Sequence, residues 1–272
     1  MNIDVLKKLK SAGLLSEIEL NLGDIPTGSY ALNRIISGSY HKGIPIGMIT
    51  QFKGPSSSGK TVFATHVLRE AQRKDCYTIF IDSENAYNPD FASSLGIDPK
   101  KLIYANPPTI EECFGTMTNL VHEIREHDEN TPIVIVYDSI AVSPIAEELK
   151  TDSYEAHNMI GAMRAKVTGA CLRKINSLLR SKIVALIIIN QIREKVGIVY
   201  GNPETNAGGG RSLEYYLGVD LRCTVNKNDV IKDDNGSLLG IKGKVRNTKN
   251  KITIPFQECE FKLFFDEGLD PL

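Results

Sequence analysis

The chain has 272 residues, of which 42% are hydrophobic and 24% charged, enough to bury the core of one large domain or two small ones. Its 32 basic and 33 acidic residues give a formal net charge of -1, which excludes a uniformly basic nucleic-acid binder but leaves room for a local basic surface. No apolar run approaches the about 18 residues of a membrane helix, and the N-terminus lacks a signal-peptide pattern, so we expect no membrane segment.

The five cysteines are scattered along the chain and form no Cys-x-x-Cys pair. An odd number without paired spacing argues against a disulfide framework or a zinc site. We therefore expect reduced thiols in a cytoplasmic compartment.

The first segment, residues 1–27, precedes the main pattern of the chain. Apolar residues from Ile3 to Leu14 follow a roughly helical spacing, which Ser11 and Gly13 interrupt. This segment is either a helix on the chain's own core or an arm that packs on a neighbouring subunit. We treat residues 28–272 as one core domain.

From residue 44 to 190, short apolar runs alternate with stretches of helical period. The runs are IPIGMITQF (44–52), CYTIFID (76–82), TPIVIVYD (131–138) and KIVALIIIN (182–190). The expected helices lie within 60–72, 84–96, 109–127 and 159–180. Strands that are apolar throughout and separated by helices predict a mostly parallel sheet buried on both faces, hence an α/β fold.

After residue 212 the pattern changes to shorter segments with alternating polarity. They are LGVDLRCTV (217–225), LGIKGKVRN (239–247), KITIPF (251–256) and CEFKLFF (259–265). Alternation predicts strands with one solvated face, so we expect an antiparallel C-terminal extension of the sheet.

The segment GPSSSGKT (54–61) fits the phosphate-binding pattern G-x-x-x-x-G-K-[ST] in full and lies between an expected strand and an expected helix. Glycines let backbone N–H groups close around phosphate oxygens, and the helix start adds its positive dipole end. Lys60 is expected to reach the terminal phosphates and Thr61 to ligate Mg²⁺; the alternative is a plain serine-rich turn. The expected nucleotide contacts are Gly54, Pro55, Ser56, Ser57, Ser58, Gly59, Lys60 and Thr61.

Two carboxylates follow expected strands and should meet at the same edge of the sheet as this loop. Asp138 follows IVIVY and suits the role of orienting Mg²⁺ through water, while Glu84 follows IFIDS and suits the role of polarising the attacking water. Asp82 competes for either role, and an acid at such a position is often only a helix cap.

Five blocks, in this order and spacing, resemble the RecA recombinase family and its UvsX-like phage members. They are GPSSSGKT, FIDSENAYNPDFASSLGID, VIVYDSIA, NQIREKVGIVYGNPET and KNKITIPF, and the resemblance covers roughly residues 28 to 265. It implies a RecA-like P-loop core with ATP and Mg²⁺ as cofactors.

The resemblance also implies roles for individual residues. Glu84 matches the catalytic glutamate and acts with Lys60 and Gln191, which together with Asn190 matches the sensor of the γ-phosphate. Phe91 matches an aromatic residue that stacks on adenine. Asn88 stands where an aspartate usually lies near the adenine amino group, and its carbonyl is expected to accept the same hydrogen bond. Lys249 and Lys251 match lysines that reach a neighbour's nucleotide.

The sequence departs from the family pattern at three places. Ser56 stands where bacterial members commonly have a glutamate, GGGRSLEYY is one residue longer than usual, and Glu214 falls near an expected lysine. The chain stops at FDEGLDPL, so the C-terminal domain of bacterial members is missing, either because the protein is minimal or because the sequence is truncated.

Residues 160 to 195 contain eight basic residues against one acid, Glu194. Alone, such a run is usually a solvated helix face. It lies, however, between KTDSYEAHN (150–158) and GIVYGNPETNAGGGR (197–211), which match the two DNA loops of the family. The expected DNA contacts are Lys166, Arg173, Arg193, Lys195, Val196, Gly197, Gly208, Gly209, Gly210 and Arg211. Lys166 and Arg173 match family positions that hold phosphates, and Val196 matches an apolar residue that wedges between base triplets. The N–H groups of the glycines at 208–210 can also approach phosphates closely because glycine has no Cβ, so binding should be largely sequence-independent.

These patterns predict an ATP-dependent recombinase that forms homo-oligomeric helical filaments on single-stranded DNA and pairs it with homologous duplex DNA. DNA-stimulated hydrolysis would convert ATP to ADP and phosphate, in the cytoplasm of a bacterium or a phage-infected bacterial cell. Two alternatives stay open: a hexameric helicase-type or clock-type ATPase on the same fold, and a recombination mediator that does not hydrolyse ATP.

Overall fold

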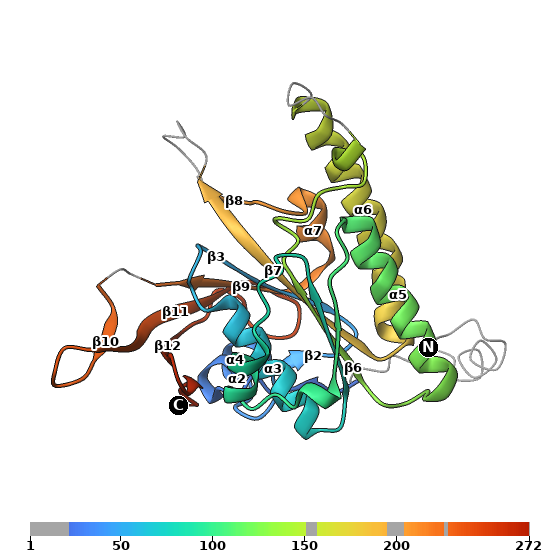
Figure 1. Cartoon of the computed structure of the whole chain (residues 1–272). Helices are drawn as coiled ribbons and strands as arrows, with labels where there is room; N and C mark the ends of the chain where they lie inside the picture. Colours follow the sequence, from blue (N-terminus) through green and yellow to red (C-terminus); the bar gives the residue numbers. More distant parts are fainter. Residues whose placement is uncertain (1–21, 151–156, 195–203, 226–227, 272) are drawn as a thin grey trace, which may run out of the picture.

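The computed structural model describes residues 22–150, 157–194, 204–225 and 228–271, and shows one large sheet between two layers of helices (Figure 1). The strand order is β13-β12-β11-β9-β3-β7-β6-β4-β5, with β10 paired to β11 and β8 paired to β7. The strands from β9 to β5 in this order pair in parallel. The predicted α/β fold is therefore confirmed. The parallel strands are β3 (Ile49–Gly54), β4 (Tyr77–Asp82), β5 (Leu102–Ala105), β6 (Ile133–Asp138), β7 (Val184–Glu194) and β9 (Leu217–Thr224).

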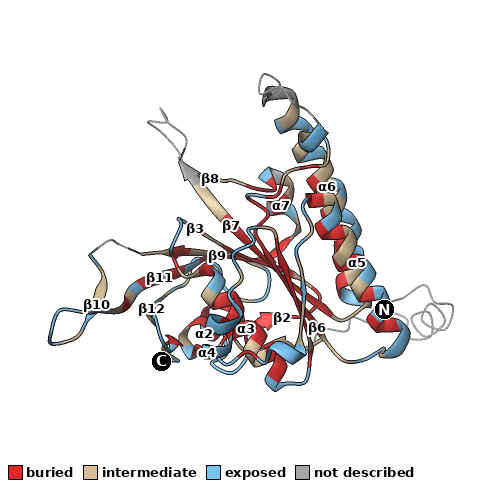
Figure 2. Cartoon of the chain, in the orientation of Figure 1, coloured by how far each residue is buried: buried red, intermediate tan, exposed pale blue. Residues whose placement is uncertain are grey.

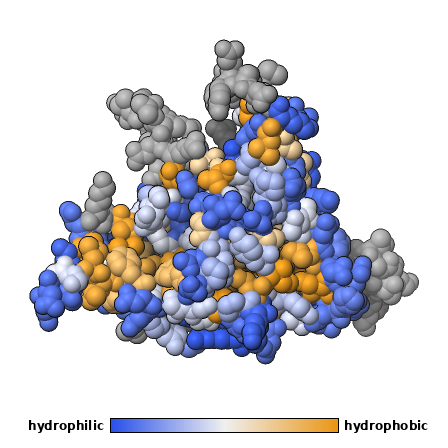
Figure 3. Space-filling model, viewed as in Figure 1, coloured by the Kyte–Doolittle hydropathy of each residue, from blue (hydrophilic) through white to orange (hydrophobic). Residues whose placement is uncertain are grey.

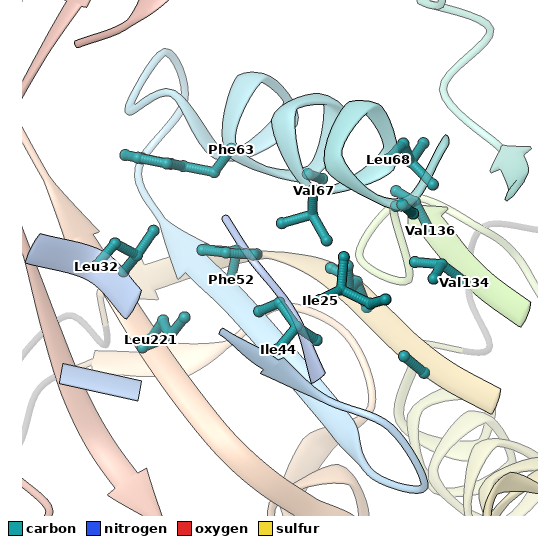
Figure 4. Close-up of a cluster of buried hydrophobic side chains, with 14 of the residues drawn as sticks. Ile25, Leu32, Ile44, Phe52, Phe63, Val67, Leu68, Val134, Val136 and Leu221 are labelled. Atoms are coloured by element: carbon teal, nitrogen blue, oxygen red, sulfur yellow. The ribbon is translucent and has the colours of Figure 1, made fainter. Parts of the chain in front are cut away.

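Alternate residues of these strands belong to two separate hydrophobic clusters. Figure 2 shows that the central strands are buried. One face, with Phe52, Val134 and Leu221, packs under Phe63 and Val67 of the helix that follows the phosphate loop (Figure 4). The other face packs against α5 and α6. A strand with both faces covered must be apolar at every position, which is why these runs show no alternation in the sequence.

The helices are divided between the two faces of the sheet. The buried residues of α2 (Tyr30–Ser37) and α3 (Lys60–Arg73) belong to one cluster, and those of α5 (Ile110–His127) and α6 (His157–Ser181) to the other. Side chains cap the starts of α2 and α5: Ser29 accepts from Leu32 N, and Thr109 accepts from Glu112 N. The remaining helices are α4 (Pro89–Ser94), α7 (Gly210–Tyr216) and the 3-10 turns η1 (Pro99–Lys101) and η2 (Glu148–Lys150).

The C-terminal strands form the predicted antiparallel extension. Strand β9 connects it to the parallel part of the sheet, since β9 pairs in parallel with β3 and antiparallel with β11. The extension comprises β10 (Val230–Lys232), β11 (Leu238–Asn250), β12 (Glu258–Phe264) and β13 (Gly268–Leu269). The remaining short strands are β1 (Asp24–Ile25), β2 (Ile44–Pro45) and β8 (Glu204–Asn206).

The strand predicted at residues 251–256 is wrong, because these residues form a turn after β11. Asn250 Oδ1 accepts from the backbone N–H groups of Ile252 at 2.8 Å and Thr253 at 3.0 Å. Phe256 then has a positive φ of 67°. These side-chain bonds take the place of the bonds that a neighbouring strand would make.

The predicted N-terminal segment lies mostly outside the described residues. Its last part is described: β1 pairs with β2, and Ile25 is buried in the cluster of α2 and α3. The boundary at residue 27 stays a prediction. Among the described helices, none combines the length and apolar character needed to cross a membrane.

Exposed apolar side chains gather at the end of the molecule that carries β11 and β12 (Figure 3). Leu238 and Phe265 are exposed at one end of the β11–β12 hairpin, and Ile254 and Phe256 are exposed in the turn at its other end.

Candidate functional site

The phosphate loop connects β3 to α3 as the motif predicts. Ser57 and Gly59 adopt positive φ angles of 59° and 83°, which turn the chain back toward the start of the helix. A Cβ on Gly54 would lie 2.4 Å from the carbonyl oxygen of Cys223, so only glycine fits against the end of β9. Pro55, Ser56 and Ser57 are exposed at the tip of the loop.

Lys60 lies beneath this tip and is only 7% exposed. Its Nζ donates to the carbonyl oxygen of Pro55 at 2.5 Å and to Ser58 Oγ at 3.4 Å. Burial lowers the pKa of Lys60, while interactions with Cys223, Asp138 and Glu84 act in the opposite direction. The ammonium is thus held under the loop with little solvation of its own.

Thr61 and Asp138, the two expected Mg²⁺ ligands, lie side by side. Thr61 Oγ1 donates to Asp138 Oδ2 at 2.6 Å. Asp138 is 6% exposed, and its burial raises the pKa of the carboxyl group to about 6. Mg²⁺ is usually held by one or two protein oxygens, with water and phosphate oxygens filling the remaining positions. The pair fits such a site, and among the described residues no cluster of three or more His, Cys, Asp or Glu offers an all-protein alternative.

Glu84 lies beside the end of β7. Its Oε1 accepts from Ser139 Oγ at 2.6 Å and from Gln191 Nε2 at 3.4 Å. The structure therefore brings together two of the three residues predicted as catalytic, from the carboxyl-end side of β4 and β7, the two parallel strands that flank β6. Ser139, which holds the carboxylate, was not singled out from the sequence, although it follows Asp138 in the motif VIVYDSIA.

Asp82, the competing acid, has a structural role. It is 1% exposed, and its carboxylate accepts from the backbone N–H groups of Glu84, Ala86 and Tyr87. Tyr104 Oη, on the edge strand β5, donates to Asp82 Oδ2 at 3.0 Å. Asp82 thus shapes the turn that carries Glu84 and is not available to a ligand. Sequence reasoning missed Tyr104 because it lies on a strand, β5, that was not predicted.

A pocket of about 210 Å³ extends from Thr61 and Asp138 to α4. Asn88 and Phe91 line its far end, and the Phe91 side chain is 39% exposed. Asn88 caps α4, since its Oδ1 accepts from the N–H groups of Asp90 and Phe91, both at 3.0 Å. This corrects the expectation that the Asn88 carbonyl is free to accept a bond from adenine.

Asn190 is fully buried and does not face the pocket. Its Nδ2 donates to Gln51 Oε1 and to the carbonyl oxygen of Gly208, and its Oδ1 accepts from Gly208 N. Gln51 in turn donates to Asp220 Oδ1 at 2.7 Å, and Lys53 forms an ion pair with the same carboxylate at 2.5 Å. A buried polar chain therefore links β9, β3 and β7 to the loop that precedes α7.

Lys249 and Lys251 lie at the end of β11. Lys249 Nζ donates to the carbonyl oxygen of Glu214, and burial lowers the pKa of Lys249. Lys251 is exposed. Neither residue lines the pocket next to Thr61, which agrees with a role toward a neighbouring chain but does not test it.

The basic residues of α6 fall into two groups. Lys166 and Arg173 are exposed, and because they are seven residues apart they share one face of the helix. Arg164 is instead tied to its own chain: Nη2 donates to the carbonyl oxygens of Ile140, Ala141 and Ser143. The eight basic residues therefore do not form one continuous free surface.

Of the predicted DNA-loop residues, Lys195, Val196 and Gly197 lie outside the described residues, and the side chains of Arg193 and Arg211 are not described. Gly208 and Gly209 are buried, whereas Gly210 is exposed. A Cβ on Gly208 would lie 2.4 Å from the carbonyl oxygen of Ile140. Because the N–H of Gly208 is bonded to Asn190, its contact with a phosphate would require release of that bond.

A family model described as the RecA N-terminal domain matches residues 8–270. The chain belongs to the RecA family. The resemblance seen in the five motifs is thus confirmed over nearly the whole sequence.

Several proteins named protein RecA are similar to the chain. That of Aquifex aeolicus (strain VF5) is 38% identical over 256 residues, which are 94% of this chain and 70% of that protein. That of Thermus aquaticus is 36% identical over 254 residues, or 93% of this chain and 70% of that protein. That of Clostridium acetobutylicum is 37% identical over 251 residues, or 92% and 67%. The recombinase function predicted from the motifs is the function of this family.

Proposed function

We propose that the chain is a DNA-stimulated ATPase that forms helical filaments on single-stranded DNA and pairs it with homologous duplex DNA. The observation that carries this proposal is the meeting of Lys60, Thr61, Asp138, Glu84 and Gln191 at one edge of the sheet. A phosphate loop, an acidic metal ligand and a carboxylate held by an amide form the set that phosphoryl transfer to water needs.

The position of each residue in this set indicates its role in ATP hydrolysis. The N–H groups of the phosphate loop and Lys60 would hold the phosphates, and Thr61 and Asp138 would hold Mg²⁺, which supplies positive charge against the phosphate oxygens when bound. Glu84, oriented by Ser139, would hold the attacking water and take up its proton. Gln191 would lose or strengthen its bond to Glu84 according to whether a terminal phosphate is present.

The same strand end supports a link between ATP and DNA. Gln191 contacts Glu84, while the adjacent Asn190 is bonded to Gly208, so β7 is joined both to the nucleotide pocket and to the loop before α7. A change at Gln191 would therefore reach the predicted DNA loop through one residue of β7. We propose that Lys249 and Lys251 act on a neighbour's nucleotide and that the exposed Ile254 and Phe256, in the turn that follows them, contribute to subunit packing.

The compartment and domain division also belong to the proposal. All five cysteines are free thiols, which fits a reducing cytoplasm in a bacterium or a phage-infected bacterial cell. Residues 1–27 would pack on a neighbouring subunit or on the core domain of residues 28–272.

Electron microscopy distinguishes this function from the alternatives. With single-stranded DNA, Mg²⁺ and a non-hydrolysable ATP analogue, we expect open helical filaments whose length follows that of the DNA. Closed rings of constant size would favour the helicase-type or clock-type ATPase. Filaments together with absent ATP hydrolysis would favour the mediator.

Removal of the two exposed charges on α6, in Lys166→Ala with Arg173→Ala, is expected to weaken binding of single-stranded DNA. If both side chains contact phosphates, the negative slope of log K against log salt becomes shallower by about 1.4, because each contact releases about 0.7 of a counterion. Fluorescence anisotropy over a salt series measures this slope. Lys232→Ala, on the distant strand β10, serves as the control and should leave the slope unchanged. An unchanged slope in the double variant would contradict the proposal that Lys166 and Arg173 on α6 contact DNA phosphates.

A further inference from the structure

Arg164 connects α6 to the turn that follows β6. Its Nη2 donates to the backbone carbonyl oxygens of Ile140 at 3.3 Å, Ala141 at 3.0 Å and Ser143 at 2.7 Å. Lys166, two residues further along the same helix, is exposed. A guanidinium group therefore joins the helix that carries the proposed DNA contacts to the turn at residues 140–143.

This turn leads to the carboxylate that we assign to water activation. Ser143 Oγ donates to the carbonyl oxygen of Ser139 at 3.1 Å, and Ser139 Oγ donates to Glu84 Oε1 at 2.6 Å. Both serines are fully buried, so a displacement of one is passed on to its packed neighbours. Two hydrogen bonds thus connect the turn held by Arg164 to Glu84.

The loop before α7 packs on the same turn. A Cβ on Gly208 would lie 2.4 Å from the carbonyl oxygen of Ile140, which also accepts from Arg164. The two backbones leave no room between them, so a movement of the turn also displaces this loop. The turn at residues 140–143 is therefore in contact with α6, with the loop before α7 and with the segment that holds Glu84.

The guanidinium group has a second partner with which it is incompletely paired. Arg164 Nη1 lies 3.9 Å from Oε2 of Glu148, on η2, which is beyond hydrogen-bond distance. Arg164 Nε and Glu148 Oε1 are buried and have no hydrogen-bond partner among the described residues. An arginine and a carboxylate commonly pair through two parallel N–H···O bonds. Such pairing would satisfy both atoms, each of which is costly when buried alone.

We propose that Arg164 and Glu148 are positioning residues through which DNA on α6 controls Glu84, an inference that rests on the ATPase function and the α6 contacts proposed above. Without DNA, Arg164 holds the turn at residues 140–143. When DNA binds, α6 shifts, Arg164 pairs with Glu148 through two bonds, and the released turn allows Ser139 to turn Glu84 toward the attacking water. The pair is thus an element with two arrangements whose balance both sites influence.

The experiment measures ATP hydrolysis with and without single-stranded DNA in two variants that act in opposite directions. Arg164→Met keeps the apolar stem and removes the donors, so the turn is released and the DNA-free rate should rise toward the DNA-stimulated rate. Glu148→Gln removes the charge that draws Arg164 from the turn, so the DNA-stimulated rate should fall toward the DNA-free rate. In both variants we expect the ratio of the two rates to fall by about fivefold or more.

The double variant distinguishes this coupling from damage to the fold. In Arg164→Met with Glu148→Gln the guanidinium group is already absent, so loss of its partner should change nothing further, and the DNA-free rate should stay as high as in Arg164→Met. Independent damage would add and would lower both rates. Arg164→Met should also bind single-stranded DNA at least as tightly as the natural chain, with a non-hydrolysable ATP analogue and fluorescence anisotropy as the measurement.

Arg125→Met and Glu147→Gln are matched controls. Arg125 likewise donates to backbone carbonyl oxygens, but in the loops before β6 and β7, at the opposite end of these strands from Glu84. Glu147 is adjacent to Glu148 and pairs with Lys150 at 3.4 Å. Both variants should keep the ratio of the natural chain.

The outcomes separate the coupling from the proposed function. If DNA stimulates Arg164→Met and Glu148→Gln as it does the natural chain, or if Arg125→Met loses stimulation to the same extent, the role of the pair is overturned and the ATPase stands. Weaker DNA binding by Arg164→Met would make Arg164 a DNA contact and overturn its positioning role. If the natural chain hydrolyses ATP without any response to DNA, the proposed function is wrong and the coupling falls with it.

Discussion

Lys60→Ala is expected to abolish ATP turnover, lowering kcat/KM by a factor of about a hundred or more. Lys60 is 7% exposed, and its pKa is lowered by burial, so water solvates its ammonium poorly. Phosphate oxygens of ATP would supply the missing partners, and their developing negative charge would be stabilised most by a cation held in place beforehand. Phosphate release in the presence of single-stranded DNA and Mg²⁺ measures the effect.

The fold should survive this substitution because alanine removes a buried charge, and the loop keeps the bond that Ser58 Oγ donates to the carbonyl oxygen of Pro55 at 2.9 Å. Without nucleotide, the thermal midpoint of the variant should stay close to that of the natural chain. Nucleotide at a hundred times its Kd raises the free energy of unfolding by about 2.7 kcal/mol, and the variant should lose this increment. Lys100→Ala removes the same charge at the start of β5, on the opposite edge of the sheet, and should turn over normally. Normal turnover in Lys60→Ala would refute the site assignment.

Glu84→Gln is expected to separate binding from turnover. Glutamine keeps the size of the side chain and still accepts from Ser139 through its carbonyl oxygen, but it cannot take a proton from water. Turnover should fall by about a hundredfold or more, in the range typical of general-base removal, while Kd for the nucleotide changes little. Single-turnover measurements together with equilibrium binding test both parts.

A second consequence of Glu84→Gln concerns DNA. If hydrolysis releases the filament, this variant should form filaments on single-stranded DNA that persist with ATP as they do with a non-hydrolysable analogue. The exposed Glu126 on α5 provides a matched control, Glu126→Gln, which should show normal turnover. Retained turnover in Glu84→Gln would assign the water-activating role to another group.

The central sheet was predictable because its strands are apolar on both faces, and this pattern arises only when helices cover both sides. The edge of the fold was less predictable. β5 was missed because Leu102–Ala105 is short and only partly buried, so its apolar pattern is weak. The turn at residues 251–256 was mistaken for a strand because its apolar residues alternate, while the bonds from Asn250 that end β11 are not visible in a pattern of polarity.

The sequence by itself determined the chemical components of the site: the order of loop, lysine, hydroxyl and carboxylates is local, and local spacing fixes which groups reach a phosphate. Family membership follows from the same motifs. Only the tertiary structure decided how each group is used. Asp82 and Asp138 both follow a strand, but one carboxylate is consumed by three backbone N–H groups while the other is bonded to Thr61. The carbonyl oxygen of Asn88 is likewise occupied by two backbone N–H groups of the α4 cap. The physical reason is that a polar side chain has few hydrogen-bonding positions, and its packed neighbours determine which of them remain for a ligand.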